Sequence, residues 1–123
     1  MANVRLSGDQ LEIKLEILDQ LLAFHGSFRI PLAHVTNAYV SPVADVELEE
    51  RLRGVGPGFV ATAGIFATPK GLIFCDLDDF EDCLVIEMRG ERFPRIAVTP
   101  ENGDSNELAH AIMRAVPDSG PES

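Results

Sequence analysis

Three segments of this chain contain residue types that could carry chemistry: a glycine-rich loop, an acidic run and a group of arginines. The glycine-rich loop, residues 54–58, holds Gly54, Gly56, Pro57 and Gly58. Such loops bind phosphate when a Lys-Ser or Lys-Thr pair and a helix N-terminus follow them. Neither follows here, because residues 60–67 have the apolar composition of a strand. We therefore expect a structural crossover that uses the backbone freedom of glycine.

The acidic run, residues 76–82, holds five carboxylates in seven positions. Counted as a calcium-binding loop, it has Phe80 at the fifth position and Glu81 at the sixth, where a ligand and an obligatory glycine are required. The run therefore predicts no metal site. We interpret it as the solvated tip of a hairpin that meets a basic partner, with Asp76, Asp78, Asp79, Glu81 and Asp82 as candidate partner-binding residues.

The arginines follow the acidic run along the chain. Arg89, Arg92 and Arg95 are the candidate basic residues, and the first two fall in a predicted hairpin tip. Acids at 76–82 and arginines at 89–95 are segregated in the sequence. This segregation predicts a contact with a partner protein or between two copies of the chain.

Two cysteines, Cys75 and Cys83, flank the acidic run. Two thiols are too few for a four-sulfur zinc site. If the run is a hairpin tip, the two residues face each other on neighbouring strands, and a cross-strand disulfide is geometrically possible. The reducing cytosol favours two packed, unjoined thiols, which is the form that we expect.

Catalysis has no visible signature in the sequence. His25, His34 and His110 are scattered, and no nucleophile-elbow or zinc-protease motif occurs. A triad built from distant residues stays open, because spatial neighbours need not be neighbours in sequence. We expect a protein that is not an enzyme and uses no cofactor.

Length and charge limit the remaining classes. The 123 residues predict one domain, residues 1–116, followed by a flexible tail, 117–123. The formal net charge of −10 disfavours nucleic acid and anionic membranes as partners. No apolar run approaches the roughly 20 residues of a membrane helix, and the first residues lack a secretory signal pattern. We expect a cytoplasmic location.

Hydrophobic periodicity predicts a mainly β chain with a closing helix. Residues 16–24 have helical spacing, and 45–52 fit surface helical turns. A C-terminal helix begins after Asp104, with Glu107 three residues on, and stops at Pro117. About seven short antiparallel strands are expected, in a barrel or a two-sheet sandwich, from the segments 4–6, 11–15, 28–30, 37–41, 60–67, 72–77, 84–88 and 95–98.

One succession of segments resembles a family of small bacterial pleckstrin-homology-like (PH-like) domains. It consists of a strand that ends in Pro31-Leu32, the glycine-rich loop after Arg53, and the segments 84–88 and 93–96. The likeness extends over residues 4–116, and its motifs are structural. It implies a PH-like barrel of about seven antiparallel strands in two packed sheets, closed by a C-terminal α-helix. The acidic run departs from the family pattern, so this surface is expected to differ from that of its relatives.

The resemblance and the residues together predict a non-enzymatic module for protein interaction or self-assembly, with no small-molecule substrate. A peripheral binder of lipid headgroups is the alternative, and a small hydrolase is the third. PH domains that bind phosphoinositides use basic residues around the first hairpin loop. Here that loop is residues 7–9, and Arg5 and Lys14 are the nearby cations.

Overall fold

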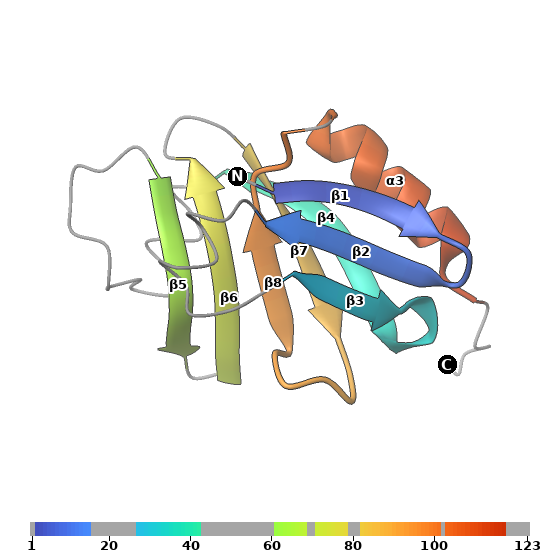
Figure 1. Cartoon of the computed structure of the whole chain (residues 1–123), viewed down its shortest axis with the longest axis horizontal. Helices are drawn as coiled ribbons and strands as arrows, with labels where there is room; N and C mark the ends of the chain where they lie inside the picture. Colours follow the sequence, from blue (N-terminus) through green and yellow to red (C-terminus); the bar gives the residue numbers. More distant parts are fainter. Residues whose placement is uncertain are drawn as a thin grey trace.

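The computed structural model describes residues 2–15, 27–42, 61–68, 71–78, 82–101 and 103–117 (Figure 1). These residues form two β-sheets and one C-terminal α-helix, so the mainly β prediction is confirmed. The predicted helical segments 16–24 and 45–52 lie outside the described residues. So do the glycine-rich loop and all of the predicted tail except Pro117.

The smaller sheet has three antiparallel strands in chain order: β1 (Ala2–Ser7), β2 (Gln10–Leu15) and β3 (Phe28–Pro31). Alternate residues of β2 are buried, as the alternation of apolar and polar residues predicts. The turn between β1 and β2 places Gly8 at a φ of 62°, a conformation that favours glycine.

The larger sheet has five strands in the order β4-β7-β8-β6-β5. A short 3₁₀ helix, η1 (Leu32–His34), leads from β3 of the smaller sheet into β4. Within the larger sheet, the pair formed by β6 and β8 is parallel and the other three pairs are antiparallel. The strands are β4 (Val35–Pro42), β5 (Ala61–Thr68), β6 (Gly71–Asp78), β7 (Asp82–Met88) and β8 (Arg95–Val98).

The position of β8 overturns the predicted hairpin at residues 76–82. β8 lies between β6 and β7, so these two strands do not pair with each other. The described residues form eight strands, and the expectation of an entirely antiparallel arrangement is wrong for β6 and β8. The error has a simple cause: strands adjacent in sequence usually pair, but here a later strand takes the place between them.

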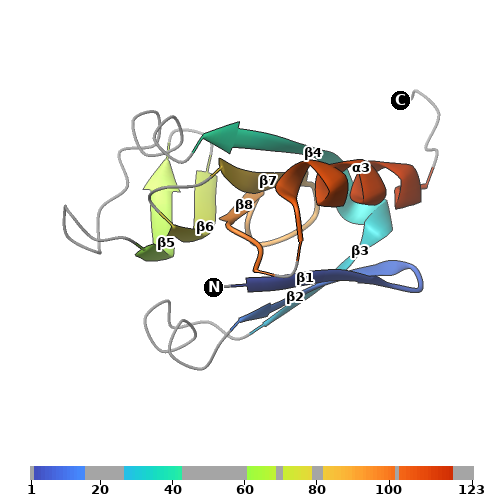
Figure 2. The same ribbon diagram turned by 90° about the horizontal axis from the view of Figure 1, so that it is seen from above.

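The main core fills the space between the two sheets and the helix α3 (Ser105–Ala115) (Figure 2). Figure 2 shows the smaller sheet below the larger one, with α3 beside β4 and β7. Helix α3 contributes the buried residues Ala109 and Ile112. Burying such side chains contributes roughly 25 cal/mol per Å² of apolar surface, which favours this layered arrangement.

The N-terminus of α3 forms as predicted. The Asp104 carboxylate accepts a 3.0 Å hydrogen bond from the Glu107 amide, and the helix ends at Ala115, two residues before Pro117. Glu107, His110 and Arg114 are exposed and form the polar face of this amphipathic helix. None of the described helices has the length and hydropathy required to cross a bilayer.

A second apolar cluster lies on the other face of the larger sheet. It consists of buried side chains from β6, β7 and β8, so these strands are buried on both faces. This explains why the sequences of these strands are nearly continuous apolar runs and do not alternate between apolar and polar residues. The members are Ile73, Cys75, Leu77, Cys83, Val85 and Ala97.

The two cysteines are not joined by a disulfide and have no exposed surface. Cys75 on β6 lies opposite Ala97 of β8, whereas Cys83 on β7 lies opposite Ser41 of β4. The strand β8 therefore separates the strands that carry the two thiols. The predicted unjoined form is confirmed, and the suggested cross-strand geometry is wrong.

Thiol reactivity tests this arrangement. We expect iodoacetamide to label both cysteines at least about a thousandfold more slowly in the folded chain than in urea, because buried thiols react only through opening. The mass of the intact chain after alkylation in urea without reductant should show two modified thiols. An unmodified chain that gains both labels only after reduction would contradict the strand order.

Candidate functional site

The predicted acidic surface is not assembled in the described part of the chain. Asp76 is only 2% exposed, and it lies opposite the core residue Val98. The prediction of a solvated tip is therefore wrong for Asp76, because pairing with β8 takes this position into the sheet. Asp82 is exposed at the start of β7. Asp79, Glu81 and the side chain of Asp78 lie outside what the structure describes.

The predicted arginine group is divided by the same strand pairing. Arg89 and Arg92 are exposed in the turn between β7 and β8, residues 89–94, as the sequence predicts. Arg95, in contrast, is 8% exposed, because it begins β8 between Ile73 of β6 and Glu87 of β7. The prediction that Arg95 lies on the surface is therefore wrong. Gly54, Gly56, Pro57 and Gly58 lie outside the described residues, so their structural role stays a prediction.

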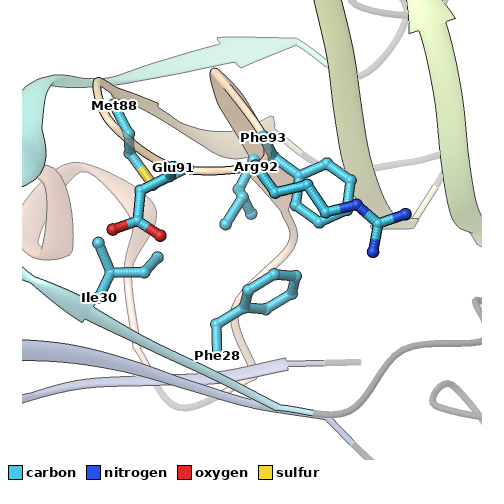
Figure 3. Close-up of a pocket in the computed structure, with 7 residues that line it drawn as sticks. Phe28, Ile30, Met88, Glu91, Arg92 and Phe93 are labelled. Carbon is cyan, nitrogen blue, oxygen red and sulfur yellow. The ribbon is translucent and has the colours of Figure 1, made fainter.

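A pocket of about 120 Å³ opens where β3 faces the turn between β7 and β8 (Figure 3). Its position joins two segments far apart in sequence, one at the edge of the smaller sheet and one at the end of the larger sheet. The lining is mostly apolar, with two charged residues from the turn. The lining residues are Phe28, Ile30, Met88, Glu91, Arg92, Phe93 and Ile96.

Three phenylalanine rings support one wall of the pocket. The centroid of Phe28 lies 4.8 Å from that of Phe74 and 5.9 Å from that of Phe93, and both pairs meet edge to face. This geometry is favourable for aromatic rings beyond the area that they bury. Phe74 is fully buried in the core, so its ring contact with Phe28 holds the Phe28 ring in place. The wall is thus preformed by core packing.

The rim of the pocket carries one positive charge, from Arg92, beside the carboxylate of Glu91. The Arg92 guanidinium lies 5.1 Å from the centroid of the Phe93 ring, within cation–π range. In Figure 3 this side chain extends past the ring toward open space. A group that enters the pocket would therefore meet an aromatic wall with a guanidinium beside it.

Backbone hydrogen bonds hold the turn in place. The Met88 amide donates to the Pro94 carbonyl at 2.8 Å, and the Arg89 amide donates to the His34 carbonyl at 2.9 Å. Gly90 has a φ of 70°, in the region that favours glycine. The turn is therefore closed at its base, between Met88 of β7 and Pro94, and attached to η1.

A side-chain pair strengthens the attachment to η1. The His34 Nδ1 atom lies 2.5 Å from a Glu91 carboxylate oxygen. Glu91 also lines the pocket, so the pair connects η1 directly to the lining. In the sequence, His34 is one of three scattered histidines, whereas the structure places it as a support for the turn.

Binding is the chemistry that this arrangement supports. Most of the walls come from Phe, Ile and Met side chains, which suit the burial of an apolar group, and Glu91 and Arg92 add one charge of each sign. In the part of the chain that the structure describes, no three His, Cys, Asp or Glu residues gather as a metal site. The sequence alone does not predict Phe28, Met88 and Phe93 as site residues. The segments that contain Phe28 and Phe93 serve there only as markers of the fold.

Comparison with known proteins gives no match: no family model, curated protein or solved structure is similar to this chain. The resemblance to PH-like domains therefore stays a prediction. Function has to be inferred from the geometry of the chain itself.

A double-mutant cycle tests the tie between η1 and the turn. We expect His34→Ala and Glu91→Gln each to destabilise the turn by about 0.2–1 kcal/mol, with little added by the second change, because the pair is partly exposed. Hydrogen exchange at the Arg89 amide should become up to about fivefold faster. Arg5→Ala is the control, since it breaks the ion pair with Glu12 on the smaller sheet. Additive effects of the two substitutions, or an equal effect of the control on the Arg89 amide, would contradict the tie.

Proposed function

We propose that this chain is a non-enzymatic protein-interaction module that takes an apolar side chain of a partner protein into the pocket beside β3. The observation that carries the proposal is the apolar pocket of about 120 Å³, with aromatic rings on one wall and the exposed Arg92 at its rim. We place its action in the cytoplasm, in keeping with the sequence.

The size of the pocket favours a side chain over a free metabolite. Pockets for small molecules usually begin at roughly 300 Å³. A dry cavity of about 150 Å³ accommodates a benzene molecule. The volume of about 120 Å³ therefore suits one branched aliphatic group or one ring.

The position of the pocket favours an extended segment as the source of that side chain. β3 is an edge strand in the described structure. Edge strands offer backbone groups to another chain, and in strand addition the pockets beside the edge select alternate side chains. A segment laid along β3 would have one of its side chains next to Phe28 and Ile30.

A PH-like identity is part of this proposal. Two sheets followed by a C-terminal helix agree with that type of domain. The parallel pair of β6 and β8 departs from the antiparallel barrel that the resemblance implies. We accordingly rest the function on the pocket and not on analogy with the fold.

The lipid alternative has less support near the first hairpin loop. Arg5 is held by Glu12, with the Nε atom 2.9 Å from a carboxylate oxygen. Glu12 also lies 3.6 Å from Arg29. The carboxylate therefore neutralises cations that a phosphorylated headgroup would require.

Peptide selection tests the proposed function. We expect a displayed library of random peptides to yield binders that share one large apolar residue. Arg92→Glu and Phe28→Leu should each weaken these binders at least about fivefold, because both alter the pocket or its rim. Arg114→Glu on the exposed face of α3 is the matched charge control and should leave binding unchanged.

Two results would contradict the proposal. One is a set of selected peptides that bind the Arg92→Glu and Phe28→Leu chains as well as the unaltered one. The other is a failure to select peptides while the chain sediments with vesicles of anionic lipid, which would favour the headgroup alternative. Circular dichroism of each variant verifies that it is folded.

A further inference from the structure

The four edges of the two sheets are not equally protected. In the described structure these edges are β1 and β3 of the smaller sheet and β4 and β5 of the larger one. An edge strand presents unpaired backbone groups, and proteins protect it by short length, charged residues, proline or a β-bulge. The presence or absence of these features indicates which edges are available for pairing.

Three of the edges carry such features. β1 has an exposed arginine, Arg5, within the strand. β3 is only four residues long and ends at Pro31, so it can pair with a short peptide segment but not with a full strand. β4 ends at Pro42, and its register with β7 shifts between Val35 and Asn37.

β5 carries none of them. Its eight residues, Ala-Thr-Ala-Gly-Ile-Phe-Ala-Thr, include no charged residue and no proline. It pairs with β6 in unbroken register from Ala61 opposite Asp78 to Thr68 opposite Gly71, so there is no bulge. Figure 1 shows β5 at the end of the larger sheet.

The composition of β5 also suits the close approach of another backbone. Gly64 lies in the middle of the strand, and three of its other residues are alanine. A glycine inside a strand often marks a site where another backbone comes close. Copies of a chain with a net charge of −10 repel each other. Because β5 has no charged residue, contact through this strand adds no further repulsion.

We infer that β5 pairs with β5 of a second copy in antiparallel orientation, which joins the two larger sheets across a two-fold axis. An antiparallel strand is complementary to itself in this way, and the same surface on both copies closes the assembly as a dimer. We commit to a second copy as the partner, because it supplies an identical strand without charged side chains that pairing would have to desolvate. This dimer does not depend on the pocket beside β3.

The salt dependence distinguishes this dimer from one held by acidic and basic residues. Backbone pairing does not involve charges, while the like net charges of two copies oppose it. Raising the salt concentration should therefore strengthen the dimer. A contact between the acidic run of one copy and the arginines of the other would instead weaken as the salt concentration rises.

Sedimentation velocity of the full chain tests the inference. From about 10 μM to about 1 mM protein, we expect a monomer–dimer equilibrium that shifts toward dimer between low and high salt. Thr62→Lys and Ala63→Lys each introduce a charge at a neighbouring position within β5. Each should weaken the dimer at least about tenfold, because a charged side chain on an edge strand disfavours its pairing with another chain.

Met113→Lys is the matched control, since it adds the same charge to an exposed position of α3 and should leave the equilibrium unchanged. Circular dichroism shows which variants retain the fold. Two neighbouring positions are substituted so that the test still holds if one variant does not fold. A monomer at every concentration and salt level would overturn the inference. So would a dimer that both folded lysine variants leave intact, or one that dissociates as salt rises.

Discussion

The parallel pairing of β8 with β6 is the interaction on which the rest of the larger sheet depends. Phe74 of β6, Ile96 of β8 and Ile86 of β7 lie opposite one another across the three strands. Without β8 in this place, β6 and β7 would have no shared neighbour and the core between the sheets would lose its centre. The Thr99 amide extends the pairing by a 2.9 Å hydrogen bond to the Asp76 carbonyl. Parallel strands are stable when both faces are covered, and the two apolar clusters meet this requirement.

The same pairing creates the pocket. Because β8 returns antiparallel to β7, the chain must turn at residues 89–94, and this turn faces β3. Hydrogen bonds to η1 hold the turn, and the buried ring of Phe74 supports Phe28 on the opposite side. The pocket is therefore a consequence of core packing and strand order.

The local features of the fold could be predicted from the sequence, whereas the long-range pairing could not. Alternation in residues 11–15 and the capping residue Asp104 act over a few positions, and both formed as expected. The partner of β6 is decided by contacts that only the folded chain brings together. Asp76 and Arg95 were assigned to the surface because charged residues are usually exposed. Both are buried, because their places in the paired strands outweigh the preference of the side chain.

The most direct measurement of the central claim is the set of backbone nuclear Overhauser effects of the isotope-labelled chain. A central β8 predicts contacts between Cys75 and Ala97 and between Phe74 and Ile96, in the slanted pattern of a parallel pair. It also predicts that Val85 and Ala97 are antiparallel neighbours. Contacts between Cys75 and Cys83 across a hairpin, with no contacts between β6 and β8, would contradict this strand order.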